Sequence, residues 1–257
     1  MAPWAGRVRR GVMTWRGVEH QLPVPKPPHA IHGTVARVPW EVLSSHGRGD
    51  GAGPDGGGGG GGGQDGGAGG GSAPEAGTAG AVLRADLGGD WPWPGHAVLR
   101  YALDESSLTT TLEVHADEQE MPAWTGLHPW FPRTLRGQRV RISLAARSVL
   151  AAQEEGIPTL EEVPLPDGPA EDAGLNDTLA GVTWPVTLTW PGVAALEVSA
   201  DAPWAVVFTQ REEAVCVEPQ TAPPDATALG LEGLAAPGSP VALTTTWRWR
   251  VGGDEGA

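Results

Sequence analysis

The chain has 257 residues, enough for one large β domain or two smaller ones, and a formal charge of −14 at neutral pH. This acidic balance argues against nucleic acid or an anionic membrane as a partner, because both require clustered Lys and Arg. The single cysteine, Cys216, excludes an internal disulfide, and the sequence has no apolar run of the roughly 18 residues that a membrane helix needs. Because no apolar signal-peptide segment follows the charged start, we expect a cytoplasmic protein.

Glycine dominates residues 46–80, a stretch with almost no large apolar side chain. Such a composition buries too little surface to offset the entropy of ordering, so it predicts a disordered loop. Because the entropy of loop closure grows only slowly with length, this loop can be inserted within a single domain that spans residues 1–257.

The rest of the chain alternates apolar and polar residues with period two, which indicates strands. The predicted strands are rich in β-branched and aromatic residues and cover 109–115, 140–144, 186–190, 205–210, 214–218 and 242–250. Prolines between these segments exclude long helices, and only residues 144–156 are compatible with a helical turn, with a loop at its tail. The pattern therefore predicts an all-β fold, a large antiparallel β-sandwich.

Two ionisable residues stand in apolar, proline-flanked segments. Glu218 ends an apolar strand just before Pro219 removes a hydrogen-bond donor from the ladder. A carboxyl group at the buried end of a strand tends to keep its proton, which suits a general base, but a glutamate at the solvent edge fits the same spacing. His128, in GLHPWF, is followed by Pro129 and either points into a concave face or is hydrogen-bonded within the core.

Two other kinds of site fit the sequence less well. His29 and His32 have a spacing found in some zinc sites, but no cysteine pair or HExxH accompanies them, and Pro27, Pro28 and Gly33 oppose a helix. A Ser-His-Asp hydrolase is disfavoured because the sequence has no GxSxG motif. We therefore expect no metal at these histidines.

Five motifs in order, APWAGRV, PHAIHG, GLHPWF, GLNDTLAG and CVEPQTAPPDA, resemble those of the aldose 1-epimerase (galactose mutarotase) family. The resemblance implies a large antiparallel β-sandwich that interconverts the α and β anomers of a free aldose, without a cofactor or metal. It also implies that Glu218 takes the proton of the C1 hydroxyl while His128 donates one to the ring oxygen. The proton roles reverse when the ring closes.

The same resemblance assigns the sugar-binding residues. Arg7 matches the arginine that reaches the sugar hydroxyls and ring oxygen, and His32 the histidine that orients the C1 end. Asn176 stands where the family usually has aspartate, so either Asp177 substitutes after a small loop shift or the preferred sugar differs. Trp130 is expected to pack against the apolar face of the sugar.

One departure from the family concerns the start of the chain. Family members carry strands before the first motif, whereas here only Met1 and Ala2 precede Pro3. We therefore expect the first strands of the fold to be missing and the true start codon to lie upstream. A sandwich without those strands would expose edge hydrogen-bonding groups.

Two alternative functions remain open. IHGTVARVPWEV also resembles a motif of hexose-6-phosphate 1-epimerases, and Arg37, Arg133 and Arg136 are available for a phosphate. A non-catalytic carbohydrate-binding relative is the second alternative, although pure binding does not require an acid and a base. In each case the partner is a small sugar, and we expect a monomer or weak dimer.

Overall fold

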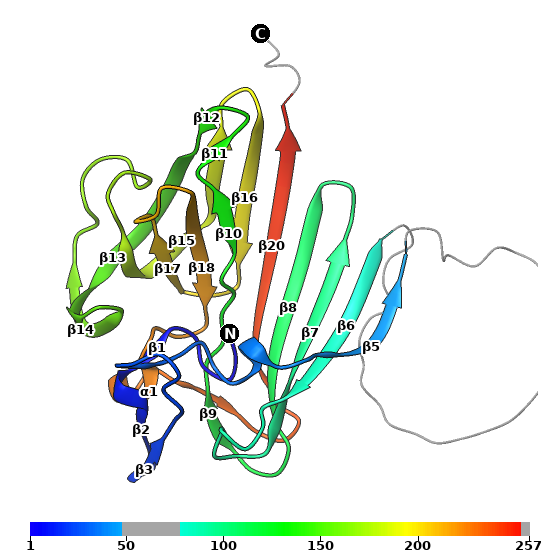
Figure 1. The fold of residues 1–257 in the computed structure, drawn as a ribbon, viewed down its shortest axis with the longest axis vertical. Helices are drawn as coiled ribbons and strands as arrows, with labels where there is room; N and C mark the ends of the chain where they lie inside the picture. Colours follow the sequence, from blue (N-terminus) through cyan, green and yellow to red (C-terminus); the bar gives the residue numbers. More distant parts are fainter. Residues whose placement is uncertain (48–77, 253–257) are drawn as a thin grey trace, which may run out of the picture.

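The computed structural model describes residues 1–47 and 78–252, and its main feature is a 12-stranded antiparallel sheet (Figure 1). Its strands follow the order β10-β18-β17-β15-β16-β20-β8-β7-β6-β5, and β13 and β14 join this path at β15. Their bounds are β5 (Glu41–His46), β6 (Ala79–Asp86), β7 (Gly95–Leu103), β8 (Ser107–Ala116), β10 (Trp130–Pro132), β13 (Arg141–Glu154), β14 (Ile157–Val163), β15 (Asn176–Trp190), β16 (Ala194–Ala200), β17 (Trp204–Phe208), β18 (Ala214–Gln220) and β20 (Val241–Val251).

Smaller elements lie at both ends of this sheet: β11 and β12 at one end, and the other short strands with α1 at the opposite end (Figure 1). Four two-stranded pairs form: β1 (Arg7–Val8) with β4 (Ala30–Ile31), β2 (Val12–Trp15) with β3 (Val18–Gln21), β9 (Met121–Ala123) with β19 (Gly233–Ala235), and β11 (Thr134–Leu135) with β12 (Gln138–Arg139). The helical elements of the described residues are α1 (Ala226–Leu229) and two short 3-10 turns at Arg9–Gly11 and Val35–Arg37. No helix in this part of the chain is long and apolar enough to cross a membrane.

The predicted all-β class is confirmed, because the described residues are mostly strand and form a large antiparallel sheet. Each of the six predicted strands overlaps an observed one, namely β8, β13, β15, β17, β18 or β20. Buried apolar side chains form two clusters, one around the amino-terminal segment and β9, the other around β15, β17 and β18. The period-two pattern was therefore a sound guide to these elements.

The helical turn with which residues 144–156 are compatible does not form. Residues 144–154 belong to β13, which pairs with β15 on one side and with β14 on the other, and the loop expected at the tail is the turn at 155–156. Its alanine, arginine and glutamine residues favour helix by only a fraction of a kcal/mol each, roughly 0–0.7 kcal/mol on propensity scales. Hydrogen bonding and packing along both edges of the strand outweigh that preference.

Strands β5 and β6 lie next to each other and flank the glycine-rich stretch. His46 pairs with Gly80, so both ends of the predicted insertion 46–80 belong to adjacent antiparallel strands. Residues 48–77, on which the prediction of a disordered loop mainly falls, lie outside the described residues. Both strands are at the far edge of the sheet from β10 and β18.

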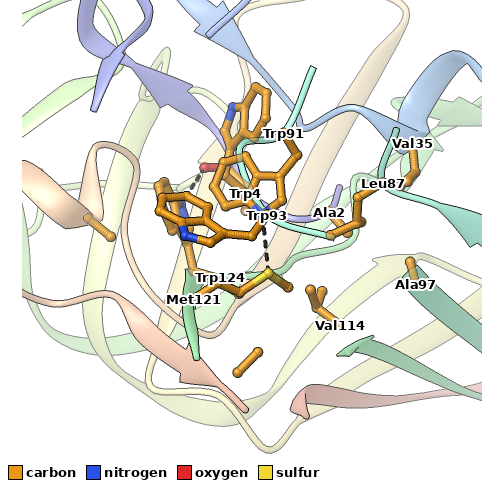
Figure 2. Packing of buried hydrophobic residues seen from close by; sticks show 14 of the residues in the cluster. Ala2, Trp4, Val35, Leu87, Trp91, Trp93, Ala97, Val114, Met121 and Trp124 are labelled. Atoms are coloured by element: carbon orange, nitrogen blue, oxygen red, sulfur yellow. Dashed lines mark hydrogen bonds between the residues drawn. The ribbon is translucent and has the colours of Figure 1, made fainter. Parts of the chain in front are cut away.

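A tryptophan cluster fixes the amino-terminal segment against the sheet end (Figure 2). Trp4 stacks on Trp91 with ring centroids 5.6 Å apart, and the indole of Trp124 donates a hydrogen bond to the Ala5 carbonyl at 2.9 Å. Aromatic pairs of this kind add about 0.5–1.5 kcal/mol beyond the burial of their area. The cluster therefore holds the backbone that leads into Arg7.

The expectation that the first strands of the fold are missing is not borne out. The amino-terminal residues form the paired strands β1 to β4, and Ala2, Trp4 and Ala5 are buried. Ala2 also forms a parallel bridge with Gly33. The first described residues thus cover part of the core instead of leaving it open.

Candidate active site

One cavity brings together most of the residues that the sequence singles out. Its empty space is about 570 Å³, including the part that is open to solvent. The predicted site residues among its lining residues are Arg7, His32, His128, Trp130, Asn176 and Glu218. Asp177 is not among them.

Strand register explains how His128 and Glu218 meet, although they are far apart in sequence. Two antiparallel pairs bracket the site: Trp130 with Cys216, and Gly126 with Gln220. His128 lies midway between Gly126 and Trp130, and Glu218 lies midway between Cys216 and Gln220, so the two residues face each other. Its Nε2 atom is 3.3 Å from Glu218 Oε1.

Two further strands, β17 and β15, also contribute residues to the cavity, and strand pairing determines which ones. Glu218 pairs with Val206 and then Thr178, and the next row on this face holds Phe208 and Asn176. Because successive side chains of a strand point to opposite faces, Asp177 belongs to the other face. There it pairs with Val207, which is buried in the second apolar cluster. The structure brings Asn176 into the cavity and leaves Asp177 out.

Burial shapes the protonation of the His128–Glu218 pair. Glu218 is 4 % exposed, and burial raises its pKa to about 8, against the opposing charge of Arg7. Burial also lowers the pKa of His128. Near neutral pH the pair therefore holds one proton, which the two opposite shifts place on Glu218. Such a pair can accept and donate a proton within the same site.

His32 owes its position to a left-handed turn. His32 and Gly33 have φ angles of +63° and +77°, and a Cβ atom at Gly33 would lie 1.9 Å from the Ala2 carbonyl oxygen. Only glycine fits there. The turn brings the His32 ring against the edge of His128, with centroids 5.1 Å apart. Burial, and next the charge of His128, lower the pKa of His32 to about 3, so the ring is neutral.

Arg7 is held at the cavity by the tip of the β13–β14 hairpin. Its Nη2 atom is 3.2 Å from the Glu155 carboxylate. At Gly156, which also lines the cavity, a Cβ atom would lie 2.1 Å from Arg7 Nη1. A side chain at residue 156 would displace the guanidinium, so glycine at this position lets the hairpin backbone and Arg7 lie in contact.

Trp130 forms the exposed side of the site. It is 48 % exposed and stacks on His128 with ring centroids 5.3 Å apart and an interplanar angle of 22°. The guanidinium carbon of Arg211 lies 5.6 Å from the Trp130 centroid, within the range of a cation–π contact. An aromatic surface therefore remains open beside the acid–base pair.

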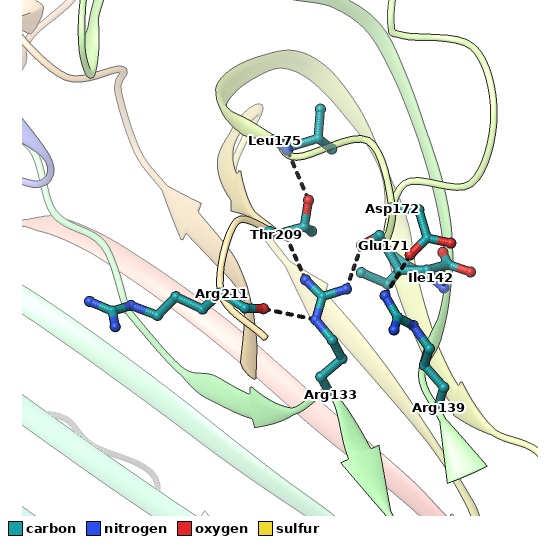
Figure 3. Close-up of polar contacts among 8 residues, drawn as sticks. All are labelled: Arg133, Arg139, Ile142, Glu171, Asp172, Leu175, Thr209 and Arg211. Carbon is teal, nitrogen blue, oxygen red and sulfur yellow. Dashed lines mark hydrogen bonds and ion pairs between the residues drawn. The ribbon is translucent and has the colours of Figure 1, made fainter. Parts of the chain in front are cut away.

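Arg133, which the sequence offered as a phosphate ligand, has a structural role (Figure 3). It is 4 % exposed and donates to three carbonyl oxygens: to Arg211 at 2.8 Å, and to Glu171 and Thr209 at 2.5 Å each. These bonds fix the loop after β17 that carries Arg211. None of the three arginines predicted for a phosphate lines the cavity.

The two histidines of PHAIHG separate in space. His29 is buried, and its Nδ1 accepts a hydrogen bond from the Arg10 amide at 3.1 Å. Its Nε2 lies 3.6 Å from Glu154 rather than near His32. Among the described residues, the groups that could hold a metal do not include either histidine.

Gln220 is a site residue that the sequence reasoning missed. It lines the cavity, is fully buried, and its side-chain oxygen and nitrogen have no hydrogen-bond partner among the described residues. A bound hydroxyl group would satisfy both atoms, because an amide offers a donor and an acceptor. Its place two residues after Glu218 on one strand was the available signal.

The chain belongs to the aldose 1-epimerase family, because the model of that family, described as aldose 1-epimerase, matches residues 75–246. The matched region contains His128 and Glu218, whereas Arg7 and His32 precede it. A search of curated proteins finds no match.

Solved structures share the galactose mutarotase-like fold. A galactose 1-epimerase from Lactobacillus acidophilus NCFM is 19% identical, with a TM-score of 0.69 over 98% of this chain and 79% of that one. A galactose mutarotase-like protein from Clostridium acetobutylicum is 13% identical, with a TM-score of 0.72 over 96% and 77%. An aldose epimerase homologue from C. elegans is 14% identical, with a TM-score of 0.69 over 98% and 82%. These identities establish the fold alone.

Proposed function

We propose that the chain is an aldose 1-epimerase that interconverts the α and β anomers of a free hexose such as glucose or galactose. The observation that carries this proposal is the contact of 3.3 Å between His128 Nε2 and Glu218 Oε1 at the cavity. The reaction requires one base and one acid near the same hemiacetal carbon, and this pair supplies both.

Ring opening starts with the C1 end of a sugar within reach of both groups and with the shared proton moved from Glu218 to His128. Glu218, now the carboxylate, removes the proton from the C1 hydroxyl, and His128, now the imidazolium, donates a proton to the ring oxygen. The bond between C1 and the ring oxygen breaks, and an open-chain aldehyde forms. After rotation about the C1–C2 bond, closure with reversed proton roles gives the other anomer, and no net proton is consumed. Each transfer typically contributes about 10²–10⁴ in rate.

The remaining cavity residues fit an uncharged sugar. Arg7, Asn176 and Gln220 offer hydrogen bonds to hydroxyl groups, and Trp130 offers an apolar surface for one face of a pyranose ring. Arg7 is already paired with Glu155, which reduces the positive charge available for a phosphate. A free hexose is therefore the better substrate than a hexose 6-phosphate. Retention of both a base and an acid favours catalysis over binding alone.

Polarimetry on freshly dissolved α-D-glucose and α-D-galactose tests the proposal. Purified chain should accelerate the approach to equilibrium rotation over buffer, and hexose 6-phosphates run in parallel should respond less. A folded chain that accelerates neither free sugar would contradict the proposed activity. Acceleration with only the 6-phosphate would move the substrate to the phosphorylated class.

A further inference from the structure

A third side chain with a metal-binding atom lies beside the acid–base pair. Cys216 precedes Glu218 by two residues on β18, so both side chains point to the same face of the sheet. Within residues 1–47 and 78–252, one group of histidine, cysteine and carboxylate side chains places its potential ligand atoms within 4.8 Å of one another. It consists of His128, Cys216 and Glu218.

These three donors are the kinds that zinc prefers. Thiolate, imidazole and carboxylate ligands bind Zn²⁺ at about 2.0–2.3 Å, so the ligand atoms of a tetrahedral site lie somewhat more than 3 Å apart. His128 Nε2 and Glu218 Oε1 are already separated by 3.3 Å. Small side-chain adjustments at Cys216 would complete the set.

The charge balance of the site depends on the ion. Cys216 is fully buried and Glu218 nearly so, and burial raises the pKa of both groups, so without an ion both hold a proton at neutral pH. An ion that displaces these protons leaves two buried anions, and its two positive charges compensate them. His128 and Glu218 line the cavity, so an ion can reach them from solvent and keep its open position toward the cavity.

We propose that His128 and Glu218, which line this cavity, and Cys216, which does not, together bind a thiophilic divalent cation such as Zn²⁺. The ion displaces two protons to solvent, the one that the His128–Glu218 pair shares and the one on the Cys216 thiol. It then occupies the lone pairs of Glu218 and His128 that catalysis needs. Its binding therefore inhibits the enzyme. This inference goes beyond the proposed function, because metal binding at these residues does not depend on which sugar is turned over.

Titration with Cd²⁺ tests the site without any activity measurement. Cys216 is the only cysteine of the chain, so the ultraviolet charge-transfer band of a cadmium–thiolate bond reports this residue alone. We expect a saturable band that Cys216→Ala abolishes. Glu218→Gln and His128→Asn should each raise the Kd by at least about tenfold, since even losing a group that only orients a ligand costs about 10–100-fold. An absent band, or a Kd that neither variant changes, would overturn the proposal.

Inhibition by Zn²⁺ gives a second, independent arm. Cys216→Ala should raise the inhibitory concentration by about tenfold or more while basal turnover stays close to wild type, with Cys216→Ser as a second variant if the first melts early. The surface pair His96 and His115, stacked at 4.8 Å, is the matched control, because it offers alternative zinc ligands. Changing both to Gln should leave inhibition unchanged. Loss of inhibition in that control but not in Cys216→Ala would overturn the proposal.

The cadmium titration and the zinc inhibition assay test metal binding and mutarotase activity separately. If the chain lacks mutarotase activity, the cadmium band still reports whether the three side chains bind a metal. Melting curves for each variant show that a lost band reflects a lost ligand and not an unfolded chain.

Discussion

The cavity is built from two parts that hold their residues in different ways. On the sheet side, antiparallel register alone places His128 opposite Glu218 and carries the row on to Val206 and Thr178. On the amino-terminal side, Arg7 and His32 depend on a left-handed turn and on the hairpin tip that contacts Arg7.

This difference suggests a division of labour. Glu218 lies on β18, which is paired with β10 on one side and β17 on the other, and His128 is held between the Gly126–Gln220 bridge and β10. Such positions suit groups that must transfer protons over a short distance. Turn and hairpin contacts adjust more easily, which suits groups that bind and orient a substrate. Changes to His128 and Glu218 should therefore affect kcat most, and changes to Arg7 and His32 should affect KM most.

The largest effect should come from replacing His128 or Glu218. Glu218→Gln and His128→Asn should each lower kcat by roughly 10²–10⁴, because each removes one proton transfer. The double variant should lose little more than either single variant, since the two groups act as one unit. Polarimetric rates of the three variants at matched melting temperature check this, and fully additive losses would show that the two residues act independently.

The pH profile tests the same pair without a mutation. When both groups are protonated no base is present, and because burial lowers the pKa of His128, activity should fall on the acid side below pH 6.5, the usual histidine value. When both are deprotonated no acid is present, and the pKa of Glu218 of about 8 places the alkaline limb near that pH. The measurement is kcat/KM across pH, and these limbs belong to the coupled pair. A rate that keeps rising well above pH 8 would exclude this pair as the acid and base.

On the amino-terminal side, Arg7→Ala should raise KM by roughly 10–100-fold, the value of one charged hydrogen bond, with a smaller change in kcat. Arg9→Ala is the matched control. Arg9 lies on the same segment and its Nε is 2.6 Å from Glu154, but it does not line the cavity. Michaelis curves for both variants check this. If Arg9→Ala raised KM as much as Arg7→Ala, the assignment of Arg7 to substrate binding would be contradicted.

The smallest effects should distinguish two adjacent residues of β15. Asn176→Asp restores a charge in the cavity and should lower KM about two- to tenfold, because charge-assisted hydrogen bonds are stronger. Asp177→Asn changes the opposite face of the sheet and should leave both kinetic constants near wild type. Parallel kinetic measurements on the two variants decide the point. An effect of Asp177→Asn as large as that of Asn176→Asp would mean that the strand presents the other face to the substrate.

The sheet side was the more predictable part of the molecule. Alternating β-branched and apolar residues identified the strands, and Glu218 stood out at the end of one of them. Pairing is a long-range property, however, so the sequence showed neither that His128 faces Glu218 nor that Gln220 lines the same cavity. The same limit explains the error at residues 144–156, where pairing with β14 and β15 overrides local propensity.

The amino-terminal side was predicted by motif resemblance alone. Arg7 and His32 were singled out from APWAGRV and PHAIHG, but their contacts with Glu155 and His128 come from segments far away in the chain. The choice between Asn176 and Asp177 also needed the structure, because only the pairing of β15 with β17 fixes which of two adjacent residues faces the cavity.

The most direct test of the central claim is polarimetry of α-D-galactose and α-D-glucose with wild type and Glu218→Gln at equal concentration of folded chain. We predict that wild type accelerates mutarotation well above the buffer rate and that Glu218→Gln falls to nearly that rate. A Glu218→Gln variant that keeps the wild-type rate would contradict the assignment of His128 and Glu218 as the acid and base.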